Sequence, residues 1–137
     1  MNVTMEQPIG ARLVTSDDRE RAIPATLRYT AADPLAVHTG FPAHVTLDGE
    51  EVTWTFARAL LAEGLGAPAG IGSVHIWPCG PRRTFVELHT PQGVALIWFD
   101  TLLLRRFLLR TYTVVEPGTE TVAVVLDQGL TSLFGVN

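Results

Sequence analysis

The sequence contains no lysine, and all ten of its Lys and Arg residues are arginine. Lysine codons are rich in A and T, so this absence is typical of a GC-rich genome. An all-arginine surface favours stacked and bidentate contacts over diffuse charge. Cysteine is also scarce: Cys79 stands alone, which excludes a disulfide within one chain and fits a reducing compartment.

Long apolar runs and a basic excess are missing as well. The longest apolar run is far shorter than a membrane span and is interrupted by Arg105 and Arg106, and no signal peptide is evident. The formal net charge is −4, which argues against nucleic-acid binding. We therefore expect a cytoplasmic protein with no membrane span.

Charged residues make up only 18% of the chain, whereas apolar residues make up 47% and the mean hydropathy is +0.23. A length of 137 residues predicts a single domain that spans residues 1–137. The apolar content predicts a substantial core. The low charge predicts that further surface is buried through oligomerisation or by a partner.

No arrangement of residues predicts catalysis or a bound cofactor. The four histidines lack the spacing of adjacent metal ligands, although His75 and His89 lie on neighbouring predicted strands, where they are placed to meet. There is no G-x-S-x-G elbow, and the glycines of residues 64–72 follow a helix and lack the Gly-Lys-Ser/Thr of a phosphate loop. We expect no metal, no cofactor and no enzymatic activity. An enzyme that uses Cys79 or the histidines is the alternative.

The segment Val52–Leu65 changes its hydrophobic period in mid-course. Its first residues alternate between apolar side chains and threonine, as on a strand with one buried face. The spacing then becomes helical over Ala57–Gly64, with Arg58 and Ala59 on the outer face. We expect Gly64 to end this helix in a Schellman cap.

Further strands are predicted along the chain, and Asp48-Gly49 between the alternating segments of Val45 and Val52 predicts a two-residue hairpin. Near the end of the chain, Val122–Leu126 is either a strand or the start of a short helix that reaches Phe134. Most connections are too short for parallel crossovers, so we predict an antiparallel α+β fold of about seven strands with two to three helices. The remaining predicted strands are Ile9–Val14, Leu27–Thr30, Leu35–Phe41, Val74–Trp77, Phe85–His89 and Val94–Phe99.

The helix predicted over Thr101–Tyr112 is apolar nearly all round. Leucines and a phenylalanine form one broad face for the core, but Leu102 and Leu109 fall among arginines on the opposite face. We predict that Leu102, Arg106, Leu109 and Arg110 form an interface with another subunit or with a partner. The alternative is a strand of the same domain that crosses over this helix.

Seven blocks of the sequence resemble the SsgA-like sporulation and cell-division regulators of filamentous actinobacteria, and the match runs in order from about Leu27 to Phe134. Among these regulators the chain looks most like the SsgB type. It departs from their pattern at Leu35, Ala59 and Ser73. The blocks are L-R-Y-T-A-A-D-P-L-A-V (Leu27–Val37), W-T-F-A-R-A-L-L-A-E-G-L (Trp54–Leu65), G-S-V-H-I-W-P (Gly72–Pro78), T-P-Q-G-V-A (Thr90–Ala95), F-L-L-R-T (Phe107–Thr111), P-G-T-E (Pro117–Glu120) and L-D-Q-G-L (Leu126–Leu130).

The resemblance implies a non-enzymatic regulator of septum formation, which marks division sites and recruits the tubulin-like division protein FtsZ. It also implies a homotrimer with a strongly bent or barrel-like sheet, similar to the plant Whirly proteins that bind single-stranded DNA. A related SsgA-like protein is the second implied partner, and the implied location is the cytoplasm at the division septum. The family offers no catalytic or cofactor-binding residue to transfer.

A single-stranded nucleic-acid binder is the alternative function that this fold implies. Such a protein needs a positive groove with aromatic side chains on which bases stack. The net charge of −4 argues against it. The arginines that could still form a local positive patch are Arg82, Arg83, Arg105, Arg106 and Arg110.

Overall fold

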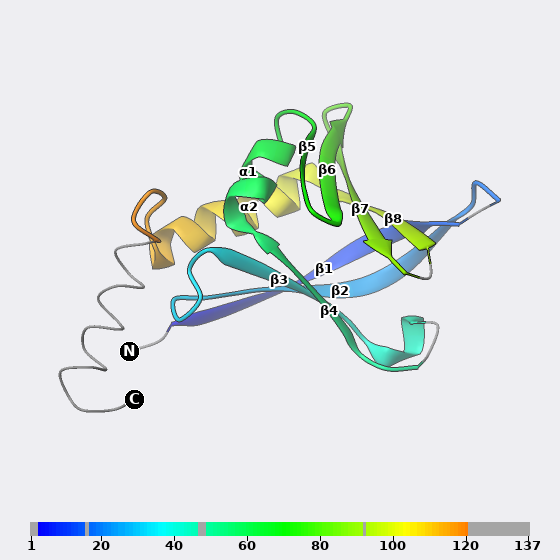
Figure 1. Ribbon diagram of the computed structural model, residues 1–137, viewed down its shortest axis with the longest axis horizontal. Helices are drawn as coiled ribbons and strands as arrows, with labels where there is room; N and C mark the ends of the chain where they lie inside the picture. The colour runs from blue at the N-terminus through cyan, green and yellow to red at the C-terminus, as the bar shows by residue number, and fades with distance from the viewer. Residues whose placement is uncertain (1–2, 16, 47–48, 92, 121–137) are drawn as a thin grey trace.

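A computed structural model describes residues 3–15, 17–46, 49–91 and 93–120. These residues form one eight-stranded antiparallel sheet, in the order β4-β3-β2-β1-β8-β7-β6-β5, and two α-helices (Figure 1). The helices are α1 (Arg58–Gly64) and α2 (Thr101–Val114), and a 3₁₀ turn, η1, spans Ala43–Val45. The strands are β1 (Thr4–Val14), β2 (Glu20–Thr30), β3 (Ala36–Phe41), β4 (Val52–Ala57), β5 (Ala69–Ile71), β6 (Val74–Cys79), β7 (Arg83–Thr90) and β8 (Gly93–Asp100).

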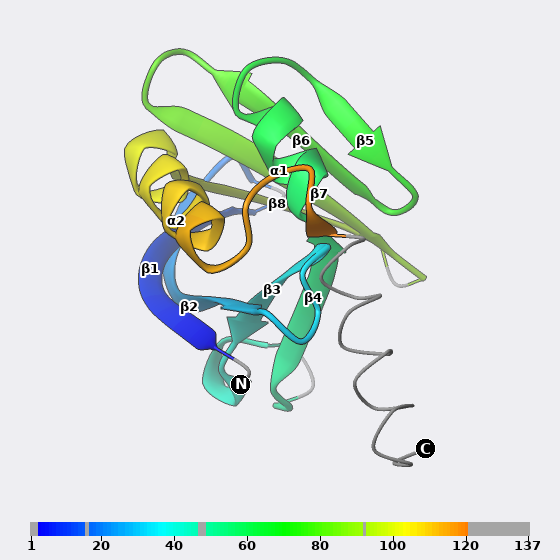
Figure 2. The same cartoon turned by 90° about the vertical axis from the view of Figure 1, so that its left-hand side faces the viewer.

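The sheet bends into two halves that face each other, and both helices lie between them (Figure 2). β1 joins the halves: it pairs with β2 along its whole length but with β8 only over Ala11–Val14. Side chains alternate between the two faces of each strand, so that Ile23, Ala25 and Leu27 of β2 are buried on the inner face. α1 packs on β5 and β6, and α2 packs on β8, β1 and β2. The core therefore lies inside the bend.

This architecture confirms the predicted antiparallel α+β fold with a strongly bent sheet. β1 and β2 are both eleven residues long, and the predictions covered only their C-terminal parts. Pro8 and Pro24 interrupt the strand pattern in the N-terminal parts, which were therefore not predicted. Both prolines lie where their strand has no second neighbour, and proline is tolerated at such positions when its nitrogen faces the open side. The eighth strand, β5, lies in the glycine-rich segment of residues 64–72, where the sequence pattern predicts no strand.

The predicted two-residue hairpin is wrong. Val45 belongs to η1 and not to a strand, and β3 is the partner of β4, with Phe41 opposite Val52. The connection therefore runs over residues 42–51, and Asp48 lies outside the described residues. The hydroxyl of Thr46 donates to a carbonyl of η1 (3.0 Å), a local bond that competes with strand pairing.

Helix α1 lies where it was predicted, but its end is not the expected Schellman cap. Gly64 is the last helical residue, and Leu65 after it is also right-handed (φ −70°, ψ −25°). A Cβ on Gly64 would lie 2.3 Å from Cγ2 of Ile76. Glycine is therefore needed at this position for the close packing of α1 on β6, and not for a reversal of the chain.

Helix α2 begins directly after β8, because Asp100 caps it. The Asp100 carboxylate accepts hydrogen bonds from the backbone N–H groups of Leu102 (2.8 Å) and Leu103 (3.4 Å). Leu104, Phe107 and Leu108 are buried, which confirms the core face predicted for this helix.

Among the described residues, no helix is long and apolar enough to cross a membrane. The strand or helix predicted from Val122 to Phe134 lies outside the described residues.

Candidate functional site

Side chains that could together bind a metal ion are the first candidates for a functional site in the part of the chain that the structure describes. No three His, Cys, Asp or Glu side chains gather there in an arrangement for a metal. His75 and His89 do meet, as their strand positions predicted, with ring centroids 5.3 Å apart. His89 also contacts the carboxylate of Glu87, which faces His75 across the ladder. The result is a hydrogen-bonded contact between an imidazole ring and a carboxylate on the sheet surface, beside a second imidazole ring.

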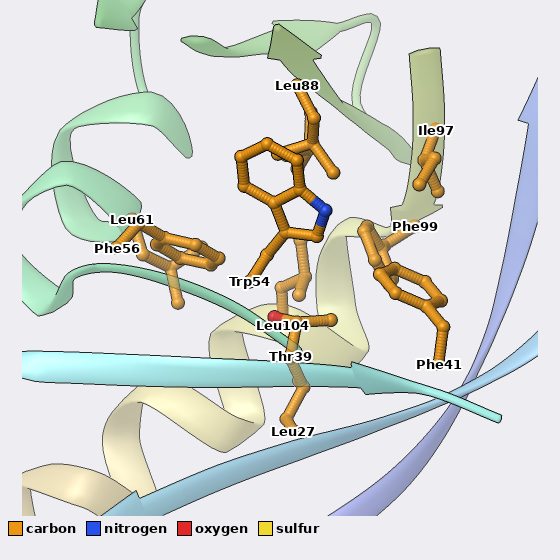
Figure 3. Close-up of a pocket in the computed structure, with 11 residues that line it drawn as sticks. Leu27, Thr39, Phe41, Trp54, Phe56, Leu61, Leu88, Ile97, Phe99 and Leu104 are labelled. Carbon is orange, nitrogen blue, oxygen red and sulfur yellow. The ribbon is translucent and has the colours of Figure 1, made fainter. Parts of the chain in front are cut away.

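A small hollow lies in the core between the two halves of the sheet (Figure 3). Its volume is about 10 Å³, roughly the room that one water molecule needs. Trp54 and Phe56 of β4 close one side, and Ile97 and Phe99 of β8 face them. The hollow is a packing defect of the core and is too small for a ligand.

The outward side of α2 exposes apolar and basic side chains together. Leu102 and Leu109 are 54% and 58% exposed, and Arg105, Arg106 and Arg110 beside them are exposed too. We call these five residues the α2 outer face. The predicted positions of Leu102, Arg106, Leu109 and Arg110 on one exposed face are thus confirmed, and no strand of the described residues covers the two leucines. Their role as an interface stays a prediction.

The α2 outer face is held on β1 through Gln7. The Gln7 amide nitrogen donates to the backbone carbonyl of Leu103 (3.4 Å), and its oxygen accepts from Arg110 (2.9 Å). Residues 101–114 contain no aspartate or glutamate. The face is therefore a positive surface on a chain whose net charge is negative.

Arg58 lies inside the molecule and not on the outer face of α1, where the helical spacing predicts it. The helical spacing put it on the outer face of α1, but only 3% of the residue is exposed. Its guanidinium carbon lies 5.0 Å from the ring centroids of both Tyr29 and Tyr112, which places the cation between two aromatic rings. The side chain thus points inward, toward the end of α2.

The donors of Arg58 bind the C-terminal end of α2 and the segment after it. Nη1 donates to the backbone carbonyls of Thr111 (3.2 Å) and Val115 (2.7 Å), and Nη2 forms a hydrogen-bonded ion pair with Glu120. The last carbonyls of a helix have no partner within the helix and carry partial negative charge, so a cation is favourable there. We call Arg58, Tyr29, Tyr112 and Glu120 the Arg58 clamp.

Two pKa values are shifted within the Arg58 clamp. The hydrogen bond from Arg58 lowers the pKa of Glu120 below its usual value. Burial raises the pKa of Tyr29, whose hydroxyl donates to the carbonyl of Pro34 (2.7 Å). At neutral pH the clamp therefore holds one carboxylate against one guanidinium, with the tyrosine neutral.

The lowered pKa of Glu120 predicts acid sensitivity. A carboxylate whose pKa is lower in the folded state stabilises the fold fully above its unfolded pKa, and that stabilisation is lost as the pH falls through its folded pKa. We expect the Tm of the wild type to exceed that of Glu120→Gln at about pH 7, and the difference to shrink between about pH 5 and about pH 3. Thermal unfolding followed by circular dichroism across that range measures it. An equal Tm difference at every pH would contradict the ion pair.

A groove opens to solvent beside the Arg58 clamp. Its volume is about 510 Å³ and its walls are mainly apolar. Leu35 and Ala59, two of the three positions at which the resemblance predicts a departure from the family pattern, both line it, whereas Ser73 does not. We call it the α1 groove. Its lining residues are Leu35, Ala57, Arg58, Ala59, Ala62, Glu63, Tyr112, Pro117, Gly118 and Glu120.

The outer surface of β6, β7 and β8 carries a second group of partly exposed rings. Trp77, Phe85 and Trp98 lie opposite one another on adjacent strands, and the first two rings stack with centroids 5.7 Å apart. Arg83 lies 4.5 Å above the Trp98 ring, and the indole N–H donates to Glu20 (3.0 Å). The positive charge of this outer aromatic row is thus partly balanced by a carboxylate.

Comparison with known proteins places these features in a family. The family described as "Streptomyces sporulation and cell division protein, SsgA" matches residues 23–120. The sporulation-specific cell division protein SsgB of Streptomyces coelicolor is 43% identical over 98% of this chain and 98% of its own length. SsgB of Salinispora tropica is 44% identical over 96% of this chain and 93% of its own.

Solved structures agree with the sequence matches. An SsgA-like sporulation-specific cell division protein from Thermobifida fusca is 32% identical, covers 96% of both chains and has a TM-score of 0.85. A structure from work on SsgB mutations that correlate to longitudinal cell division in Streptomyces coelicolor gives a TM-score of 0.80, with 41% identity over 90% of this chain and 97% of the other. The chain belongs to the SsgA-like family of sporulation and cell-division proteins, and the relatives from Streptomyces coelicolor and Salinispora tropica are named SsgB.

Proposed function

We propose that this protein is a non-enzymatic adaptor of cell division in sporulating actinobacteria. It acts in the cytoplasm at the division septum, where it marks the site and recruits the tubulin-like division protein FtsZ. It works as a homo-oligomer, a homotrimer, together with a related SsgA-like protein. Family membership supports the role in division, since its relatives are named sporulation-specific cell division proteins.

The α2 outer face is the observation that carries the adaptor mechanism. Leucines that remain more than half exposed on an otherwise well-packed helix favour a protein contact, and arginine is enriched among the residues that dominate such contacts. The helix is fixed at its start by Asp100 and at its end by the Arg58 clamp. A surface that is already rigid loses little entropy on binding, which favours affinity.

Substitution of both exposed leucines tests the proposal. We expect Leu102→Glu/Leu109→Glu to weaken self-association, FtsZ binding or both by about tenfold or more, because each new carboxylate would be desolvated in the interface. Light scattering after size exclusion gives the mass of the protein in solution. Co-sedimentation with purified FtsZ polymers gives the binding.

A matched control separates this surface from a general effect of added charge. Ile71 and Val94 are 63% and 60% exposed and lie on β5 and β8, away from α2. Ile71→Glu/Val94→Glu adds the same charge and should leave mass and FtsZ binding unchanged. If Leu102→Glu/Leu109→Glu also leaves the mass in solution and the FtsZ binding unchanged, the α2 outer face is not the interface. Failure of the wild-type protein to bind FtsZ polymers would reject recruitment itself.

The outer aromatic row favours a second function, binding of single-stranded nucleic acid. Partly exposed rings beside arginine are the elements of a stacking platform. The backbone N–H of Thr101 donates to the carbonyl of Arg82 (2.9 Å), so the β6–β7 turn with its arginines adjoins the start of α2. Glu20 and the net charge of −4 oppose it. Fluorescence anisotropy with a labelled oligonucleotide at low salt decides: binding that weakens steeply with salt supports this function, and no binding excludes it.

A further inference from the structure

The charged residues that line the α1 groove leave it with a net negative charge. Three of its described lining residues are charged, namely Arg58, Glu63 and Glu120. Arg58 and Glu120 neutralise each other in the Arg58 clamp. Glu63 is exposed at the end of α1 and has no ion pair within the described residues. The groove is therefore apolar with one uncompensated negative charge, and it is complementary to a ligand that is apolar and positively charged.

The α2 outer face has the complementary character. Leu102 and Leu109 are seven residues apart, which separates them by about 10 Å along the helix axis. Arg105 and Arg106 lie between them, and the helix offers no carboxylate to neutralise these arginines. Two leucines, with two guanidinium groups that form no ion pair in the part of the chain that the structure describes, thus make an apolar and positive ridge about two turns long.

The ridge does not fill the groove of its own molecule. Leu102 and Leu109 remain more than half exposed, while Tyr112, from another side of the same helix, forms part of the groove wall. Pairing of two α2 outer faces with each other would bring their arginines together without a carboxylate, and such like-charge contact is unfavourable. A contact between the ridge of one molecule and the groove of another would bury the exposed leucines against apolar walls and bring opposite charges together.

We infer that the α2 outer face of one copy docks in the α1 groove of a second copy, with Arg106 facing Glu63. The contact is head to tail, because different surfaces of the two copies meet. A head-to-tail contact produces a ring when its rotation closes and a filament when it does not. The inference rests on the homo-oligomer of the proposed function and specifies which surfaces form it.

Charge reversal on each side of the contact tests the inference. We expect Glu63→Arg and Arg106→Glu each to raise the concentration at which the protein assembles by about tenfold or more. The double variant Glu63→Arg/Arg106→Glu restores the opposite charges and should assemble nearly as the wild type does. Sedimentation velocity over a concentration series measures all four proteins, and circular dichroism confirms that each is folded.

The controls are Glu51→Arg and Arg21→Glu, which make the same charge changes at exposed positions outside both surfaces. They should assemble normally. Single reversals that assemble like the wild type overturn the inference, and so does a double variant that is no better than the singles. A wild-type protein that stays monomeric at every concentration also overturns it. Co-sedimentation with FtsZ is measured on the same samples, so that failure of the docking contact is distinguished from failure of the adaptor role.

Discussion

Replacing Arg58 by alanine is expected to lower the free energy of unfolding by about 3–5 kcal/mol, the range typical of a buried charge network that loses one partner. The guanidinium is almost fully buried and donates to two backbone carbonyls and one carboxylate. Its loss leaves the carbonyls of Thr111 and Val115 without this donor and removes the counter-charge of Glu120. Tyr29 and Tyr112 also lose the group that fills the space between them.

Urea unfolding followed by tryptophan fluorescence measures this effect, and three further variants identify its source. Arg58→Lys keeps the charge but cannot donate to several acceptors in one plane. Its free energy of unfolding should therefore lie between those of the wild type and Arg58→Ala. Glu120→Gln should lower the free energy of unfolding less than Arg58→Ala does. The Glu120 side chain is 19% exposed, and the hydrogen bonds from Arg58 to the backbone carbonyls remain. Arg105→Ala, on the exposed side of α2, should be within about 0.5 kcal/mol of the wild type. A loss below about 1 kcal/mol for Arg58→Ala would show that the clamp does not hold α2.

Regular patterns in the sequence predicted the regular parts of the fold. Alternation over Val52–Phe56 predicts a strand with one buried face, because successive side chains point to opposite sides. The leucine spacing of α2 gave both its core face and its exposed leucines, since a helix repeats every 3.6 residues. The buried and exposed faces of a strand or helix can be predicted because they depend on the spacing of residues that are close together in the sequence.

The position of Arg58 depends on residues distant in the sequence. Helical spacing placed it outside, but its partners Thr111, Val115 and Glu120 are more than fifty residues away. One signal was present. Arg58 is in the first turn of α1, where a cation opposes the helix dipole, and Ala57 before it gives no side-chain cap. A basic residue at such a position is worth examining for a tertiary partner.

The α1 groove could not be predicted for the same reason. It is formed where the turn before β3, α1 and the end of α2 meet, and no local pattern brings Leu35 beside Ala59. The family resemblance did single out both positions, although without showing that they share a surface. Their common place in the groove makes it the first surface to compare among family members.

Substitution of Gly64 by alanine is expected to give the other large loss of stability, about 2 kcal/mol net of any gain in helix propensity. The new methyl group would lie 2.3 Å from Cγ2 and 2.5 Å from Cβ of Ile76, and 3.1 Å from the Ile76 carbonyl oxygen. Ile76 is fully buried on the central part of β6, so its side chain has no free space into which to turn. Either α1 or β6 must move.

The control for Gly64→Ala is Gly10→Ala, which makes the same substitution on a strand, at a site with open surroundings. Gly10 is exposed on β1, and a Cβ there would have no atom within 4 Å. Gly10→Ala should be neutral or slightly stabilising, because alanine restricts the unfolded chain more than glycine does. Both variants are compared by urea unfolding. Equal stability of the two would show that α1 is not packed tightly on β6. A selective loss in Gly64→Ala would show that glycine is kept at this position for contact across the core, since the left-handed conformation that usually explains a glycine at a helix end is absent here.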